Sequence, residues 1–348
     1  AENGIVRSMG SLGALYQHGF GVQKNAAEAV RWYKKGASTG SPDVMSKLAD
    51  MYLDGEGVEK NADEAFRLYK QAAEKEYVNG MYMLGVMYFM GKGVAKNLDE
   101  AANWFRKAAD VYRQFPDDSH ARTMLGLMYQ NGFGVEKSME EAARWYKKGA
   151  EAGNSGAMVS LSYLYSQGLG VEKNVGEAVR LTKMAAELEN SAAMNHLGWL
   201  YQSGIGVDKS LPDAIRWYRK GAEAGEGDAM VNLGVMYENG TGVDKNNDEA
   251  LRWYRKGVEL ENPHAMNALS AMYLNGKGVE LNYEEGVRWA RKAADLGSAA
   301  AMANLGWAYE YGKGVEQNKE SAIKWYRKSS ALGNDYAIAQ LKRLGELH

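Results

Sequence analysis

Residues 233–267 read LGVMYENGTGVDKNNDEALRWYRKGVELENPHAMN, and the rest of the chain repeats this stretch. The turn marker G-x-G-V within it occurs nine times, and successive copies start 36 residues apart, except for one step of 41 residues between Gly91 and Gly132. A fixed period of this length is typical of stacked supersecondary units and not of one globular core. The period alone therefore predicts an architecture of stacked repeats.

Each repeat has the pattern of two helices joined by a glycine-containing loop. Apolar residues from Met230 onward recur at the i, i+3, i+6 and i+7 spacing of one helical face, which predicts a first helix, helix A. Two glycines two residues apart follow, and they suit a chain that leaves a helix through left-handed backbone angles. Asn246 and Glu249 then form a capping-box pattern, in which the Asn side chain accepts from a free amide and the Glu reaches back to the cap. A second helix, helix B, is expected to begin there.

A helix hairpin of this kind cannot bury its own apolar face, so neighbouring hairpins must stack. The sequence therefore predicts an all-α solenoid of nine helix-turn-helix repeats of about 36 residues, followed by a C-terminal capping helix over 335–347. We expect residues 1–348 to form a single solenoid domain, because a solenoid grows without the size limit of a compact core.

These motifs resemble the Sel-1-like repeat (SLR) family, which is related to the tetratricopeptide repeat proteins. The resemblance rests on helix A ending in L-G-x-x-Y, on the G-x-G-V turn and on the A-x-x-W-Y-x-K stretch, and it covers essentially the whole chain. It implies a right-handed superhelix of antiparallel helix pairs with a concave inner surface. It also implies protein binding as the usual role, without a shared catalytic site.

Composition excludes several classes of function. The formal net charge is −2 and the pI is near 6.3, so neither a nucleic-acid surface nor an anionic-membrane surface is indicated. No apolar run approaches the ~20 residues that span a bilayer. The chain has no cysteine, which excludes disulfide frameworks, thiolate metal sites and cysteine nucleophiles. Together with a start at Ala1 that lacks an initiator Met and a signal peptide, this favours a processed bacterial protein of the periplasm or outside the cell. A cytoplasmic protein or a trimmed chain is the alternative.

No catalytic, cofactor or metal site is predicted. A lone G-x-G could suggest a phosphate cradle, but here it recurs nine times between two helices and no Lys-Ser/Thr follows it. No G-x-S-x-G or other nucleophile context appears. The histidines never fall at i, i+4 and have no cysteine partners, which leaves a zinc site weakly supported; they are His18, His120, His196, His264 and His348.

The recurring R-W-Y-K/R-K stretch ends helix B. Acids at the start of the same helices balance its bases, as the helix dipole favours, so it predicts a solvated outer face rather than a nucleic-acid patch. Seven of the nine tryptophans occupy this framework position and are expected to pack between helices as core: Trp32, Trp104, Trp145, Trp217, Trp253, Trp289 and Trp325.

Residues that break the repeat on helix A are the candidates for holding a partner. If helix A lines the inner surface, as the resemblance implies, the positions two before and two, five and six after the framework leucine face the groove. Periodic positions hold the fold, and variable ones can bind. The candidate protein-binding groove consists of Asp50, Asp54, Tyr82, Phe89, Met90, Gln130, Tyr163, Trp199, Gln202, Glu238, Trp307, Glu310 and Tyr311. Tryptophan and tyrosine dominate interface hot spots, although ordinary packing between repeats is the alternative for any single residue.

The third repeat carries a five-residue insertion within 110–120, which reads DVYRQFPDDSH. One interpretation is a longer helix B that stops before Pro116. The other is a binding loop at the rim, because insertions in repeat proteins collect on one face and aromatic residues beside acids are good anchors. The candidate rim residues are Tyr112, Phe115, Asp117 and Asp118.

The sequence thus predicts a non-catalytic module that holds another protein in an aromatic and acidic groove suited to apolar and basic residues. The resemblance suggests a concrete form, an immunity or inhibitor protein that neutralises a secreted toxin such as a phospholipase effector. One alternative is a scaffold for several signalling, envelope-assembly or host partners. A less favoured one is an enzyme like the cysteine-rich relatives described as beta-lactamase-like. No cofactor is expected, and the oligomeric state is left open.

Overall fold

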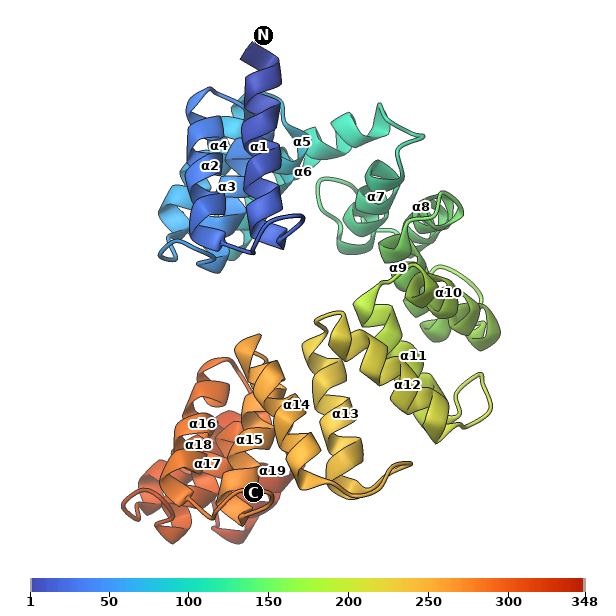
Figure 1. Cartoon of the computed structure of the whole chain (residues 1–348). Coiled ribbons are helices and arrows are strands. Elements are labelled where there is room, and N and C mark those ends of the chain that lie inside the picture. The colour runs from blue at the N-terminus through green and yellow to red at the C-terminus, as the bar shows by residue number, and fades with distance from the viewer. Residues whose placement is uncertain (1, 347–348) are drawn as a thin grey trace. The chain divides into compact units, whose positions relative to one another are not determined.

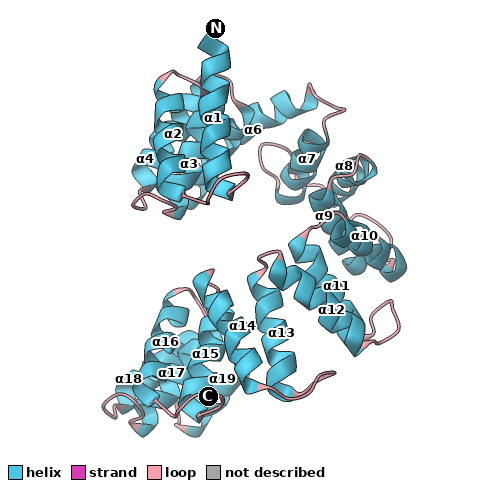
Figure 2. Cartoon of the chain, viewed as in Figure 1, coloured by secondary structure: helices cyan, strands magenta, loops and turns pink. Residues whose placement is uncertain are grey.

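The computed structural model describes the backbone of residues 2–346 and the side chains of residues 8–346. These residues form nineteen helices and no strand, which confirms the predicted all-α solenoid (Figures 1 and 2). None of the described helices combines the length and the apolar character needed to cross a membrane. The A helices are α1 (Glu2–His18), α3 (Pro42–Asp54), α5 (Val78–Met90), α7 (Ser119–Asn131), α9 (Ser155–Gln167), α11 (Ser191–Ser203), α13 (Gly227–Asn239), α15 (Pro263–Asn275) and α17 (Ala299–Tyr311). The B helices are α2 (Ala26–Ser38), α4 (Ala62–Glu74), α6 (Leu98–Arg113), α8 (Met139–Glu151), α10 (Val175–Glu187), α12 (Leu211–Glu223), α14 (Asn247–Glu259), α16 (Tyr283–Asp295) and α18 (Lys319–Ala331), and the chain closes with α19 (Asp335–Arg343).

The solenoid divides into two compact units, Ala1–Lys173 and Asn174–His348. The division falls within the fifth repeat, between α9 and α10. Within each unit, consecutive helices pack on each other, and A helices of neighbouring repeats also pack together, as α3 does on α5 and α13 on α15. The B helices pack on A helices. The A helices of neighbouring repeats therefore share one face of the stack in each unit, and we call this face the inner edge.

The core of most repeats centres on a helix-B ring that is not the framework tryptophan. The residue after the tryptophan position is fully buried in seven repeats, as Tyr33, Tyr69, Phe105, Tyr146, Tyr218, Tyr254 and Tyr326. Of the framework tryptophans only Trp253 is fully buried, so the prediction that all seven are core is confirmed in full for Trp253 alone. The other six are partly buried, and four of them pack against the hydrophobic core, namely Trp104, Trp145, Trp289 and Trp325. A helix turns about 100° per residue, so the tyrosine and the tryptophan lie on different parts of the helix surface, and the tryptophan is the less buried of the two. A lysine three residues further on lies over the tryptophan ring, as Lys220 does over Trp217 at 4.7 Å.

The buried ring lies directly against the glycine of the L-G-x-x-Y motif. A Cβ on Gly198 would be 2.6 Å from the ring of Tyr218, so only glycine lets the two helices approach this closely. In the eighth repeat both residues change together. Ala290 replaces the tyrosine, and a buried Ser270 replaces the glycine and donates to the carbonyl of Gly286 at 2.7 Å. Ring and glycine therefore form one packing unit in most repeats, and the second repeat is an exception because Ala49 lies at the glycine position while Tyr69 remains fully buried.

The starts of the B helices confirm one half of the predicted capping box. The Asn246 side chain accepts from the amide of Glu249 at 3.0 Å, and every other B helix has the same kind of cap. The other half is wrong, because the Asn246 amide donates to the carbonyl of Tyr237 at 2.9 Å and Glu249 instead accepts from Arg252 at 3.1 Å. The bond to Tyr237 ties the start of helix B to the end of helix A across the glycine loop.

Two further expectations concern helix ends. Helix α6 continues to Arg113 and has 16 residues against 13 in the other B helices, which confirms the interpretation of the insertion as a longer helix. The capping helix α19 ends at Arg343, short of the predicted boundary, and the chain then leaves through Gly345 with a φ of 75°. Leu347, at the predicted end, lies outside the described residues, as do Ala1 and His348.

Candidate protein-binding surface

The predicted groove residues lie on A helices of both units. In the first unit they come from α3 (Asp50, Asp54), α5 (Tyr82, Phe89, Met90), α7 (Gln130) and α9 (Tyr163). In the second unit they come from α11 (Trp199, Gln202), α13 (Glu238) and α17 (Trp307, Glu310, Tyr311). The structure separates them into residues that serve the core of their own repeat and residues whose side chains are exposed at the inner edge.

Four of the polar candidates accept a hydrogen bond from the buried tyrosine of their own repeat. The hydroxyl of Tyr218 donates to Gln202 at 2.7 Å. The same bond, always over 16 residues, joins Tyr146 to Gln130 at 2.7 Å, Tyr254 to Glu238 at 2.9 Å and Tyr326 to Glu310 at 2.9 Å. A buried hydroxyl without a partner costs ~1–3 kcal/mol, so the fold itself accounts for these polar residues. The third repeat has Phe89 and Phe105 at the two positions and needs no such bond.

The two glutamates of this set are further neutralised by bases. Glu238 also accepts from the ammonium group of Lys277 at 2.9 Å. Glu310 also pairs with Arg343 of the capping helix, and its side chain is only 11% exposed. Burial, together with the adjacent carboxylate, raises the pKa of the Tyr254 hydroxyl far above its ordinary value. The inner edge of the second unit is therefore less acidic than the sequence suggested.

The second repeat uses a different acceptor. Ala49 stands where most repeats have the glycine. The usual acceptor position is occupied by the apolar Leu53, and the hydroxyl of Tyr69 donates to Asp50 instead. Burial raises the pKa of Asp50, although the bond from Tyr69 acts in the opposite direction. Asp54, at the end of α3, is exposed.

Three candidates of the first unit expose apolar surface at the inner edge. Phe89, Met90 and Tyr163 are each exposed over 42% to 54% of their surface. The ring of Phe89 lies edge-on to the turn residue Phe133 at 5.5 Å, and Phe133 in turn stacks on the core. Tyr82 is half-buried, and its pKa is raised by burial. Phe89 and Met90 thus form an apolar patch at the end of α5.

The second unit exposes a different aromatic group. Trp199 is 45% exposed and stacks on His196 of the same helix, with ring centroids 5.7 Å apart and planes 25° apart. Burial lowers the pKa of His196, so its imidazole is neutral at pH 7. Trp307 is half-buried between Tyr283 and Tyr311, and Tyr311 is exposed. Trp199 is therefore the more accessible of the two non-framework tryptophans.

Sequence reasoning missed a set of amide pairs on the same edge. Asn232 donates to Asn195 at 2.9 Å, and Asn304 donates to Asn267 at 3.0 Å. Each pair joins A helices of neighbouring repeats and spans 37 residues, so a search for asparagines one residue beyond the period could have found both. They tie α11 to α13 and α15 to α17.

The four candidate rim residues have different roles. The prediction that Tyr112 lies on the rim is wrong. Its side chain is 2% exposed and its hydroxyl donates to Asn79 at 3.0 Å, so it belongs to the core. Asp118 caps α7 by accepting from the amide of Ala121 at 2.6 Å. Asp117 pairs with Arg122. Phe115 alone among the four is an exposed aromatic side chain.

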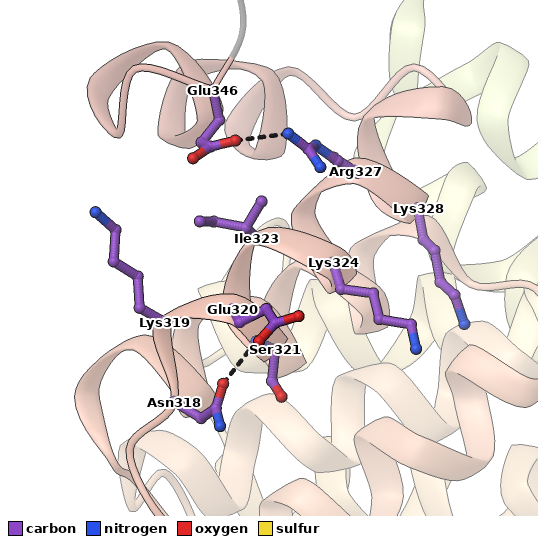
Figure 3. A pocket seen from close by; sticks show the side chains of 9 residues that line it. All are labelled: Asn318, Lys319, Glu320, Ser321, Ile323, Lys324, Arg327, Lys328 and Glu346. Carbon is purple, nitrogen blue, oxygen red and sulfur yellow. Dashed lines mark hydrogen bonds and ion pairs between the residues drawn. The ribbon is translucent and has the colours of Figure 1, made fainter.

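No described part of the structure has the form of a catalytic or metal site. Among the described residues, no three His, Asp or Glu side chains gather closely enough to hold a metal ion. A surface hollow of about 980 Å³ lies along α18, and Figure 3 shows the side chain of Lys319 extending to the opposite side from those of Lys324 and Lys328. Its Arg327 pairs with Glu346 at 2.5 Å. The hollow therefore presents no convergent group of reactive side chains.

Comparison with known protein families identifies the same repeats. Nine stretches match the Sel1 repeat family, at residues 6–41, 42–77, 78–110, 119–154, 155–190, 191–226, 227–262, 263–298 and 299–334. The gap between the third and fourth matches coincides with the insertion. The chain matches no curated protein.

Several solved structures are similar to the chain. A protective antigen of uropathogenic Escherichia coli strains that displays an SLR fold is 35% identical, over 99% of this chain and 73% of that one, with a TM-score of 0.59. A Sel1 repeat protein from Oxalobacter formigenes is 29% identical, over 72% of this chain and 96% of that one, with a TM-score of 0.62. An immunity protein from Pseudomonas aeruginosa is 27% identical, over 53% of this chain and 67% of that one, with a TM-score of 0.40. Sel1 repeats are protein-interaction modules and indicate no enzyme family, and with nine of them along its length the chain belongs to the Sel1 repeat family.

Proposed function

We propose that the chain is a non-catalytic protein-binding module that holds its partner on the inner A-helix edges. The exposed Trp199 on α11 is the observation that carries this proposal. Its ring is held in place by stacking on His196, so little side-chain entropy is lost when a partner covers it. Accessible, pre-positioned tryptophans are typical interface hot spots.

The apolar patch of Phe89 and Met90 supports the same role for the first unit. A stable interface covers about 800 Å² on each partner, which is more than one aromatic side chain supplies. A partner that contacts A helices of several repeats in one unit would cover an area of that order. Because Glu238 and Glu310 are already paired, we expect the partner to be recognised chiefly through apolar contacts.

The finer form of the proposal is that the partner is a secreted toxin, such as a phospholipase effector, and that the chain is its immunity or inhibitor protein in the periplasm or outside the cell. This form follows from the family resemblance. Neutralisation needs only a large complementary surface that covers the active site of the toxin. A scaffold with several weak partners is the alternative.

The test is affinity capture from the native organism with three baits: the wild type, Trp199→Ala and a matched control, Leu260→Ala. Leu260 has a similar exposed fraction to Trp199, but it is the C-cap residue of α14, a B helix. One dominant partner that Trp199→Ala loses and the control retains supports the proposal. Its Kd, measured by calorimetry, should rise about 30-fold in Trp199→Ala, as for a hot spot of ~2 kcal/mol.

Three other results argue against parts of the proposal. A partner that Trp199→Ala retains moves the site away from α11. Several weak partners favour the scaffold. A single partner whose hydrolytic or toxic activity is unchanged by stoichiometric wild-type protein would support binding and exclude the inhibitor form.

A further inference from the structure

A cavity in the first unit lies away from the inner edge, where two departures from the repeat meet. It has a volume of about 770 Å³ and lies between the α4–α5 connection and the last turns of α6. Its apolar lining consists of Tyr77, Val78, Met81, Trp104, Val111 and Phe115. We call it the turn pocket. Its volume is within the range of about 300–1,000 Å³ that is usual for ligand-binding pockets.

Both walls of the turn pocket come from irregular parts of the sequence. One wall is the connection after α4, where Glu76 has a φ of 60°. The other wall is the extra turn of α6, which adds Val111 and can be followed in Figure 1, together with Phe115 just beyond the end of that helix. Five other connections from helix B to helix A place glycine at the position of Glu76, namely Gly40, Gly153, Gly225, Gly297 and Gly333, and two more place glutamate there, Glu189 and Glu261. A non-glycine residue with this backbone angle is a strained choice, and such residues concentrate at functional sites.

The inserted segment is held firmly in place. Arg122 donates to the carbonyl of Pro116 at 2.6 Å, to the carbonyl of Lys148 at 3.2 Å and to Asp117 at 3.1 Å. The buried Tyr112 anchors the end of α6 from the other side. Phe115 is nevertheless 57% exposed. A pre-organised apolar side chain at the mouth of a pocket can bind without a large entropic cost.

The mouth of the pocket carries an excess of negative charge. Glu74 and Glu76 line it, and neither has an ion-pair partner within the described side chains. Asp110 is paired with Arg113 at 2.7 Å. Lys107 is the one base in the lining, and its ammonium group lies 4.1 Å from the centre of the Trp104 ring. Three carboxylates and one ammonium group therefore border an apolar cavity, and two of the carboxylates, Glu74 and Glu76, have no ion pair among the described side chains.

From this combination we infer that the turn pocket is a second protein-docking site, and that it binds a segment with a bulky apolar side chain flanked by Lys or Arg. The apolar side chain fills the space between Met81 and Phe115, and the flanking base is attracted by Glu74 and Glu76. This site is independent of the inner A-helix edge, so a failure of one proposal leaves the other intact.

The experiment uses displayed random 12-residue peptides, selected on the full chain after removal of those that bind the Phe115→Ala variant. The expected enrichment is for Trp, Phe or Leu next to Lys or Arg. Synthetic copies of the enriched peptides are then measured by fluorescence anisotropy. Binding of these peptides to the wild type should weaken with added salt, because the flanking charges are solvent-exposed.

Glu76→Gly separates binding from folding. The variant has the glycine that most other connections have, so its melting temperature should rise. Its affinity for the peptides should fall, seen as a higher Kd, because one carboxylate is lost. The matched control is Glu261→Gly, which makes the same change in the connection before α15, where φ is 54°. The control should raise the melting temperature and leave the Kd of the peptides unchanged.

Several outcomes overturn the inference. If the peptides bind Glu76→Gly as tightly as they bind the wild type, Glu76 does not attract the flanking base, and the inferred preference for Lys or Arg is wrong. Enrichment of peptides without a basic residue, or no enrichment over the starting library, rejects the docking segment. A concentration-dependent dimer that Phe115→Ala abolishes would identify a second copy of this chain as the occupant instead.

Discussion

At the scale of single residues, the recurring feature is a buried phenol matched to an acceptor 16 residues earlier. We expect Gln202→Leu to lower the free energy of unfolding by ~1–3 kcal/mol, because the hydroxyl of Tyr218 loses its acceptor. The double variant with Tyr218→Phe should recover most of this loss, since it copies the apolar pair Phe89 and Phe105 of the third repeat. Urea denaturation of both single variants and the double variant measures the coupling. Strictly additive losses would show that the bond does not matter.

The connections between repeats give a second prediction at this scale. Glu189 and Glu261 have φ values of 60° and 54°, where most connections have glycine. Replacing Glu261 by glycine should raise the free energy of unfolding by about 1 kcal/mol, because the left-handed conformation costs other residues ~1–2 kcal/mol and the extra freedom of unfolded glycine offsets only part of it. The reverse change, Gly225→Ala, should lower stability by a similar amount. Thermal unfolding followed by circular dichroism compares the two.

At the scale of elements, the A and B helices of a repeat are held at the distance that glycine and tyrosine allow. Gly198→Ala should destabilise by ~1–3 kcal/mol, although alanine favours helix, because its Cβ would lie 2.6 Å from the Tyr218 ring. Gly176→Ala is the matched control. There the nearest atom to an added Cβ is 3.5 Å away, and a gain of about 0.5–1 kcal/mol is expected. Urea titrations that give the same sign for both variants would contradict this account.

Much at this scale could be predicted because it is local. The N-cap residues of the B helices and the glycine turns depend on neighbouring residues and were correct, whereas the C-terminal helix ends at Arg343, short of the predicted boundary. The capping box was half wrong because the second acceptor, the carbonyl of Tyr237, belongs to the preceding helix. The added length of α6 followed from the insertion, but the cavity beside it depends on how α6 packs against α5.

At the scale of the whole molecule, buried tyrosines recur in both units and make stability sensitive to high pH. Burial raises the pKa of Tyr33 and of Tyr146 to about 12, and the pKa values of Tyr218 and Tyr254 are also raised. A folded-state pKa above the unfolded value of about 10 means that stability is complete below pH 10 and is lost as pH rises toward the folded value.

Each such tyrosine should therefore remove about 1.4 kcal/mol of unfolding free energy per pH unit between about pH 10 and 12. Urea midpoints measured at pH 8, 10 and 11 check this. The double variant Tyr146→Phe with Gln130→Leu should show a shallower decline, because it removes one ionising phenol together with its acceptor. A decline as steep as that of the wild type would show that Tyr146 does not contribute.

The sequence by itself determined the period, the nine helix pairs, their caps and the family, because a repeat specifies the same local structure each time it occurs. Only the tertiary structure decided which side chains of a helix are used in the core and which remain exposed to a partner. Adjacent side chains such as Trp217 and Tyr218 differ by about 100° around the helix, and the packing of helix B on helix A selects the tyrosine as core. The same packing explains why Gln202 and Glu238 serve their own repeats while Trp199 stays exposed. The 16-residue pairing of phenol and acceptor could have been found in the sequence, but the turn pocket could not, because it exists only where two irregular segments meet in space.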